Sequence, residues 1–175
     1  QDIGIEGDKI VFMTTPGAGN IEAGRVVDAT GKYVLPGGID PHVHFGNQFP
    51  PGMIGSGEGV SFGVQSGFSG SKAAACGGTT LTIDFAWQQH PYTSVMEVID
   101  VKRAEMDSEM AIDYALHAIV SGNISIEEIQ SVPKAIEYGI PTIKMFTCLA
   151  GTPEKPGFMV DDGRIWAVFQ QITRN

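Results

Sequence analysis

The chain has 175 residues, of which 42% are hydrophobic and 18% are charged, so it has enough apolar side chains for a sizeable core and too little charge for a disordered chain. The formal net charge is −9 and Lys102–Arg103 is the only adjacent basic pair, which argues against a nucleic-acid surface. No apolar run approaches the roughly 18 residues of a membrane span, and we expect a cytoplasmic protein without membrane contacts.

The first part of the chain predicts antiparallel β structure. Short apolar runs are separated by turn-forming Gly, Asp, Pro and Asn, and we expect four strands, at 2–6, 9–13, 25–29 and 32–36. After Pro36 the pattern changes to longer units. We therefore place a domain boundary there, with one domain at 1–36 and a second at 37–175.

The second part alternates apolar strands with helical segments, which is typical of βα units and a parallel sheet. The expected strands are 39–44, 79–85, 112–119 and 142–146, and the expected helices are 66–76, 94–106, 125–138 and 163–173. Four such units are half of a (β/α)₈ barrel, a fold of about 250 residues. We therefore expect an α/β fold in which 37–175 is the first half of a TIM-type barrel without its closing strands.

Two histidines end the first strand of this predicted barrel, in the segment GGIDPHVHF. Alternate residues of a strand face the same side, so His42 and His44 are expected to project together. Two imidazoles so placed can share one metal ion, and barrel enzymes place catalytic groups at the carboxyl ends of strands. The alternative is that one or both histidines are structural.

Lys144 lies in the apolar segment GIPTIKMF, which predicts the fourth barrel strand. A buried lysine loses hydration in its charged form, which favours the neutral, reactive amine. Such an amine can combine with carbon dioxide to give a carbamate that bridges two metal ions. The alternative is a lysine with a buried stem whose amine reaches solvent at the rim. Cys76 and Cys148 are expected to be buried free thiols.

Three segments in this order and spacing resemble the hydantoinase/dihydropyrimidinase family of cyclic amidohydrolases: GKYVLPGGIDPHVHF, AACGGTTLTIDF and GIPTIKMF. DIGIEGDKIV and VVDATGKYVLPG resemble that family's N-terminal β-domain. The resemblance covers nearly the whole chain. It implies a (β/α)₈ barrel together with a β-sandwich to which residues 1–36 would contribute.

The resemblance also implies a site with two divalent metal ions, most often zinc. Carried over residue by residue, His42 and His44 match the first-strand metal ligands, and Lys144 matches the carboxylated lysine that bridges both ions. Two further histidine ligands and a catalytic aspartate of the family are expected beyond Asn175, so we predict that the chain alone is inactive. His90 and His117 are not expected to replace them, and His117 is predicted to have a packing or supporting role.

The activity implied by the resemblance is the opening of a ring amide in a hydantoin or dihydropyrimidine, which gives an N-carbamoyl amino acid. Alternatives are an allantoinase or dihydroorotase-like enzyme, or a non-catalytic scaffold protein of the same family. The chain departs from the family at Leu149, where a tyrosine commonly assists the substrate carbonyl. The glycine-rich segment 46–63 is either a surface connection or a substrate-gating loop. The family further implies a tetramer, and an isolated half-barrel is expected to aggregate.

Overall fold

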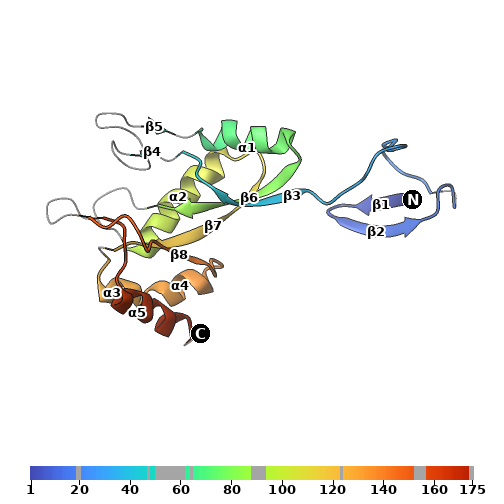
Figure 1. Ribbon diagram of the computed structural model, residues 1–175. Coiled ribbons are helices and arrows are strands. Elements are labelled where there is room, and N and C mark those ends of the chain that lie inside the picture. The colour runs from blue at the N-terminus through green and yellow to red at the C-terminus, as the bar shows by residue number, and fades with distance from the viewer. Residues whose placement is uncertain are drawn as a thin grey trace. The chain divides into compact units, whose positions relative to one another are not determined.

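A computed structural model of the chain describes residues 1–18, 21–46, 48–49, 62–63, 65–87, 94–122, 124–151 and 157–173. The chain divides into two compact units, Gln1–Pro36 and Gly37–Asn175. The first unit is a small antiparallel β structure and the second is an α/β structure (Figure 1). The α/β prediction is therefore confirmed, and the two units are described separately below.

The first unit contains one β-hairpin. Strands β1 (Asp2–Glu6) and β2 (Lys9–Thr14) pair antiparallel, from Asp2 opposite Thr14 to Glu6 opposite Lys9. The tight turn between them contains Gly7 at φ 63°, a left-handed conformation that glycine adopts without steric cost. These two strands lie where the apolar alternation predicts them.

The strands predicted at 25–29 and 32–36 are wrong, because the structure shows no strand in either segment. A strand needs a neighbour for its backbone hydrogen bonds, and in this hairpin β1 and β2 pair with each other. The apolar side chains that suggested burial are exposed instead, with Val26 at 83% and Tyr33 at 96% of their full accessibility. Whether residues 1–36 contribute to a β-sandwich stays a prediction.

The second unit is built on a curled parallel sheet in the order β3-β6-β7-β8. Its strands are β3 (Gly38–Val43), β6 (Thr79–Ala86), β7 (Asp113–Val120) and β8 (Ile143–Met145). Two short strands, β4 (Gln48–Phe49) and β5 (Phe62–Gly63), form a separate antiparallel pair. All four predicted barrel strands are confirmed to within a few residues.

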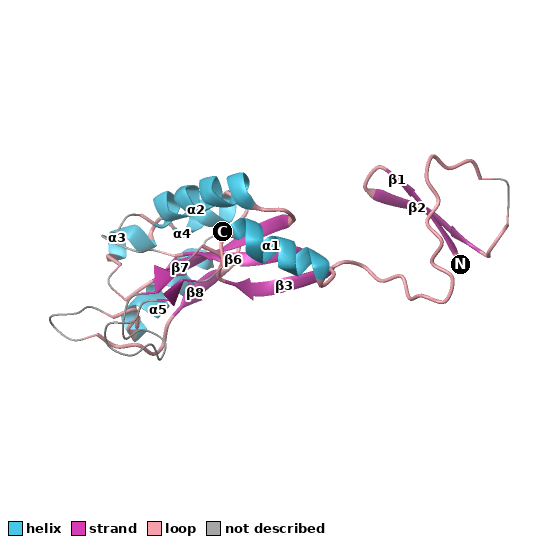
Figure 2. Cartoon of the chain, turned by 90° about the horizontal axis from the view of Figure 1, so that it is seen from above, coloured by secondary structure: helices cyan, strands magenta, loops and turns pink. Residues whose placement is uncertain are grey.

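Helices connect these strands. They are α1 (Gly67–Cys76), α2 (Val95–Glu109), α3 (Ile126–Ile129), α4 (Val132–Glu137) and α5 (Asp162–Ile172). Helices α1 and α2 lie along the same side of the sheet (Figure 2). This arrangement is a parallel β/α half-barrel, as the sequence predicts.

The helix predicted at 125–138 is divided in two, into α3 and α4. Pro133 lies in the first turn of α4, where its missing N–H is of no consequence. In a continuous helix the same proline would lose the bond to the carbonyl of Ile129 and its ring would clash with that carbonyl. The chain therefore ends one helix before the proline and begins another.

The core of this unit lies between the sheet and the helices. Helix α2 contributes Val95, Ile99 and Met106 at helical spacing, and all three are buried. Val95 and Ile99 pack in one cluster with residues of β7, α4 and α5, among which Val120, Val132 and Val168 are fully buried. Each of these side chains stabilises the fold by about 1.5–3 kcal/mol.

Cys76 and Cys148 are free but exposed, so the prediction that they are buried is wrong. Cys76 is the last residue of α1 and Cys148 follows the end of β8, and at both places the chain lies at the surface. Among the residues that the structure describes, no helix is long and apolar enough to cross a membrane.

Candidate functional site

His42 and His44 lie together at the carboxyl end of β3. Their ring centres are 5.2 Å apart and the rings are nearly perpendicular, at 88°. Both rings contact the ring of Phe85 on the neighbouring strand β6, at 4.6 Å from His42 and 4.8 Å from His44. The alternation of a strand therefore places both imidazoles on the same side, as the sequence predicts.

Lys144 on β8 faces the same ring from the other direction along the sheet. Its Nζ is 5.9 Å from the centre of the Phe85 ring and 5.0 Å from that of Phe146. The ring centre of His42 lies 4.6 Å from that of Phe85. The distance from Nζ to the ring centre of His42 therefore cannot exceed 4.6 and 5.9 Å added together. The structure brings the three predicted site residues together from two strands that are not adjacent in the sheet.

The burial of Lys144 differs from the expectation. The side chain is half-buried rather than enclosed, because β8 is an edge strand of the four-stranded sheet. Together with His42, Phe85 and His117 it lines an open hollow of about 340 Å³ at the carboxyl ends of the strands. An amine so placed is accessible to small molecules.

The electrostatics favour a neutral imidazole at His44. Its pKa is lowered to about 4, mainly by burial and in smaller part by the nearby charges of His42, Lys144 and Lys102. Near neutral pH the ring therefore keeps a lone pair. A neutral imidazole is the form that binds metal ions.

His117 on β7 links the two sides of the site. One ring nitrogen, Nε2, lies 2.9 Å from the carbonyl oxygen of Pro41, and Nδ1 lies 2.5 Å from the hydroxyl of Thr142. A neutral ring satisfies both contacts, with Nε2–H donating to Pro41 and Nδ1 accepting from Thr142. Both nitrogens of His117 are thus engaged, one at Pro41, next to His42, and the other at Thr142, two residues before Lys144. A packing or supporting role for His117 stays a prediction.

A buried ion pair between β6 and α2 was not predicted from the sequence. Asp84 on β6 is 0% exposed and Lys102 on α2 is 4% exposed, and the carboxylate oxygen lies 3.5 Å from the ammonium nitrogen. Two signals in the sequence point to it: a carboxylate inside the apolar strand TTLTIDFA, and a lysine on the apolar face of α2, three residues after Ile99. Buried charges are rarely found without a partner.

An aromatic group borders the site beyond His44. The Trp87 ring centre lies 6.2 Å from that of His44, 5.4 Å from Phe146 and 5.2 Å from Phe158. The segment after β8 returns to this place, since Val160 N–H donates to the carbonyl of Phe146. Trp87, Phe146 and Phe158 therefore form an aromatic cluster beside His44.

Leu149 has φ 62°, the left-handed region that leucine rarely adopts. Its carbonyl accepts the N–H of Phe158 at 3.0 Å, which holds the loop in this conformation. His90 and most of the segment 46–63 lie outside the described residues. Within the described ranges, no group of three or more His, Cys, Asp or Glu side chains is placed to hold a metal ion.

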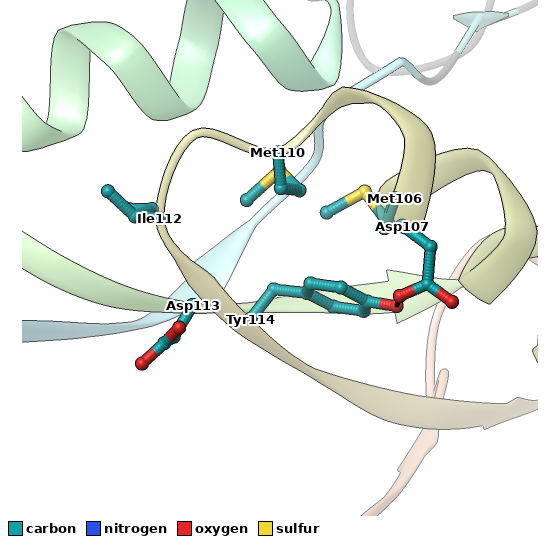
Figure 3. A pocket seen from close by; sticks show the side chains of 6 residues that line it. All are labelled: Met106, Asp107, Met110, Ile112, Asp113 and Tyr114. Atoms are coloured by element: carbon teal, nitrogen blue, oxygen red, sulfur yellow. Dashed lines mark hydrogen bonds between the residues drawn. The ribbon is translucent and has the colours of Figure 1, made fainter.

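A second hollow, of about 480 Å³, lies at the opposite end of β7 (Figure 3). Tyr114 donates a hydrogen bond of 2.6 Å to Asp107, and burial together with this bond raises the pKa of Tyr114 to about 12. Met106 and Met110 form its apolar side. Because the amino-terminal ends of barrel strands serve stability rather than catalysis, we assign no function to this hollow.

The chain is similar in sequence to known D-hydantoinases and to a dihydropyrimidinase. The chain is 33% identical to a D-hydantoinase of Streptomyces coelicolor over 177 aligned residues, covering 99% of this chain and 34% of the relative. It is 38% identical to a dihydropyrimidinase of Rattus norvegicus over 149 residues, covering 84% of this chain and 25% of the relative. No family model matches the chain.

Solved structures agree. A D-hydantoinase from Bacillus sp. AR9 superposes with a TM-score of 0.73 at 28% identity, covering 97% of this chain and 33% of that one. A dihydropyrimidinase from Brevibacillus agri superposes with a TM-score of 0.72 at 32% identity, covering 98% and 34%. The chain thus spans about a third of the length of these relatives.

Proposed function

We propose that this chain, which belongs to the hydantoinase/dihydropyrimidinase family and matches the N-terminal region of its members, carries part of a two-metal site for hydrolysis of cyclic amides. The observation that carries the proposal is the convergence of His42, His44 and Lys144 around the ring of Phe85. These residues come from two strands of one sheet and meet at its carboxyl end, where barrel enzymes place their active sites.

The donor set fits a divalent metal ion such as zinc. The two rings, with centres 5.2 Å apart, are close enough that one nitrogen of each could bind the same ion at the usual zinc–nitrogen distance of about 2.0–2.1 Å. Two nitrogen donors are too few for a complete site, since zinc is usually bound by three or four protein ligands. We therefore propose that the region of the relatives that this chain does not match supplies the remaining ligands.

Lys144 supplies the third ligand in this proposal, as a carbamate. In its neutral form the amine attacks the carbon of carbon dioxide: an N–C bond forms, one C–O π bond breaks with its electron pair moving to oxygen, and one proton passes from the nitrogen to water. The product carries a negative charge shared by two oxygens, which can bind two cations at once. The half-buried position of Lys144 supports this step, because carbon dioxide can reach the amine from the open hollow.

In this proposal the residues of this chain would bind the metal ions and support the side chains that bind them. When bound, a pair of divalent ions activates a water molecule and polarises a carbonyl group. His42 and His44, at the carboxyl end of β3, would bind a cation. His117 holds the carbonyl group of Pro41, the residue before His42, by a hydrogen bond. Trp87, Phe146 and Phe158 pack against one another beside His44. Proton transfer to the leaving nitrogen is assigned to an aspartate outside this chain.

The substrate that we propose is a hydantoin or a dihydropyrimidine, opened to an N-carbamoyl amino acid. It rests on the names of the relatives, a D-hydantoinase and a dihydropyrimidinase. Tetramer formation is carried over from the family resemblance, whereas the proposed cytoplasmic location rests on the sequence alone. The 175-residue chain by itself is proposed to be inactive.

Zinc titration of the purified chain tests the metal site. We expect His42→Ala and His44→Ala each to weaken zinc binding at least tenfold, measured by competition with a chromophoric chelator. His90→Ala is the matched control, because the context of His90 predicts no role in binding metal, and it should leave the affinity unchanged. Equal affinities for all four proteins would refute the proposed ligands.

The carbamate is tested separately by carbon-13 NMR in labelled bicarbonate. We expect a carbamate carbon signal that is strengthened by zinc and absent from Lys144→Ala. Lys134→Ala, which removes an exposed lysine on α4, should keep the signal. A signal that survives in Lys144→Ala would show that another amine reacts.

A further inference from the structure

The backbone of Phe45, the residue that follows His44, is held on both of its polar groups by buried side chains. Its N–H donates to Asp84 Oδ2 at 2.9 Å, and its carbonyl oxygen accepts a hydrogen bond from Lys102 Nζ. Phe45 lies beyond the end of β3, so the sheet does not provide these hydrogen bonds. Two side chains from two different elements provide them instead.

These two side chains are themselves an ion pair removed from water. Asp84 is 0% exposed, Lys102 is 4% exposed, and their charged groups are 3.5 Å apart. Burying such a pair costs desolvation that the mutual attraction often does not recover, and an apolar pair of similar volume stabilises a fold as well or better. Stability alone therefore does not account for this choice of residues.

The carboxylate of Asp84 contacts the backbone at two places next to the imidazoles, at Phe45 and at Phe85. While one carboxylate oxygen accepts the N–H of Phe45, the other accepts the N–H of Phe85 at 2.6 Å. The ring of Phe85 is the surface that both His42 and His44 contact. One carboxylate thus fixes the backbone after His44 and the backbone of the residue beneath both histidines.

The side chain of Phe45 and the next residue are also fixed. The Phe45 ring packs on Gly70 of α1 so closely that a Cβ at Gly70 would lie 2.3 Å from a ring carbon. Gly46 adopts φ 71° and donates its N–H to the carbonyl of Gln65 at 2.8 Å. The chain leaving the histidines is therefore held by contacts from α1, β6 and α2.

We propose that Asp84 and Lys102 are positioning residues, which hold the backbone of Phe45 and so keep His42 and His44 in the paired orientation that a divalent cation requires. Where it concerns the cation, this proposal rests on the proposed function. Supporting groups of this kind set the affinity of a metal site, since their loss typically reduces metal binding 10–100-fold. The contacts among Phe45, Asp84 and Lys102 are formed without any bound ion.

The decisive variant is the double substitution Asp84→Asn with Lys102→Met, which removes both charges and keeps similar volumes. It leaves neither member of the buried pair as an unpaired charge, and Glu105, which also lies 3.3 Å from Lys102, has a side chain that is 36% exposed, so the fold should persist. We expect amide hydrogen exchange at Phe45 to become at least tenfold faster, the NMR signals of the His42 and His44 rings to shift, and zinc affinity to fall 10–100-fold. Asp107→Asn is the matched control, because it removes an exposed carboxylate from the same helix α2 that contacts Arg103 and Tyr114.

A double variant that folds and keeps both the exchange rate at Phe45 and the zinc affinity of the original chain would overturn the proposal. A merely stabilising pair predicts a change in melting temperature without a local change at Phe45 and the two rings. If the double variant does not fold, Lys102→Arg replaces it, and retained exchange protection at Phe45 with retained zinc affinity is then the expected result. Loss of both in a folded Lys102→Arg protein would count against the proposal.

The two readouts separate this proposal from the proposed function. Exchange at Phe45 and the ring signals are measured without metal, so they test the positioning role even if the original chain binds no zinc. Absence of zinc binding in the original chain would refute the proposed metal ligands alone. Unchanged ring signals in the folded double variant would refute the positioning role alone.

Discussion

The ring of Phe85 is the residue around which the candidate site is arranged. The rings of His42, His44 and His117 lie within 4.8 Å of its centre, and the ammonium nitrogen of Lys144 lies at 5.9 Å. A phenyl face carries partial negative charge, so it attracts the lysine cation while it packs against the imidazoles. A single apolar side chain thereby sets the spacing of polar groups from three strands.

The carboxyl group of Asp84 gives a test of charge burial at the residue scale. Burial raises its pKa above the ordinary 3.8, against the opposing effects of Lys102 and of two backbone hydrogen bonds. Between 3.8 and the raised value, the folded protein binds a proton that the unfolded chain has released. The contribution of Asp84 to the free energy of unfolding therefore falls as the pH rises through this interval.

We expect the difference in unfolding free energy between the original chain and Asp84→Asn to shift in favour of the original chain as the pH falls through that interval. Urea unfolding at a series of pH values measures it. Asp28→Asn is the control with the opposite sign, because hydrogen bonds to Thr30 lower the pKa of Asp28. The same slope for both variants would contradict the assignment.

At the scale of elements, α2 carries both core residues and the buried Lys102, so its first turn matters for the site. Ser94 begins the helix, and its hydroxyl oxygen accepts the N–H of Glu97 at 3.2 Å. We expect Ser94→Ala to lower the free energy of unfolding by about 1 kcal/mol, the usual value of such a cap.

Thermal unfolding measures the effect of Ser94→Ala. Ser108→Ala is the control, since Ser108 lies in the last turn of the same helix and its hydroxyl donates to the carbonyl of Glu105. It should cost less than Ser94→Ala. A larger loss at Ser108 would show that the N-terminal cap is not what stabilises α2.

The strands of the half-barrel could be predicted from the sequence because each is a short apolar run bounded by glycine, proline or polar residues. The pairing of His42 with His44 could also be predicted, since it follows from the period of a strand. The segments at 25–29 and 32–36 have the same local pattern as strands, yet a pattern cannot supply the neighbour that a strand requires. Pro133 was the available signal for the break between α3 and α4.

Other parts of the site depend on contacts between distant residues. Lys102 and Phe45 are 57 residues apart in the chain, and neither residue alone indicates that the ammonium meets that carbonyl. The half-burial of Lys144 depends on the edge position of β8, which is a property of the sheet. Local pattern identified the candidate ligands, whereas tertiary contacts determine what holds them in place.

At the scale of the whole molecule, the described sheet has two open edges, β3 and β8. Large apolar side chains are also exposed on α5, with Trp166 at 64% and Phe169 at 50%. Unpaired strand edges and apolar patches favour association between molecules. This observation supports the sequence-based expectation that the isolated chain aggregates.

We expect the average mass of the chain, measured by sedimentation, to rise with protein concentration. The double variant Trp166→Glu with Phe169→Glu should reduce this rise, because it removes apolar surface and adds charge. Gln170→Glu adds charge to the same exposed helix without removing apolar surface, and it should have the smaller effect. Equal reduction by both would assign the association to charge and not to the apolar face.

The central claim is that His42, His44 and Lys144 share one metal site. Crystals of the chain grown with zinc and bicarbonate, measured at wavelengths on both sides of the zinc absorption edge, test it most directly. The account predicts an anomalous peak about 2.0–2.1 Å from a nitrogen of both imidazoles, and density for a carbamate on Lys144 that points toward it. Zinc bound at other residues, with neither imidazole in contact with it, would contradict the account.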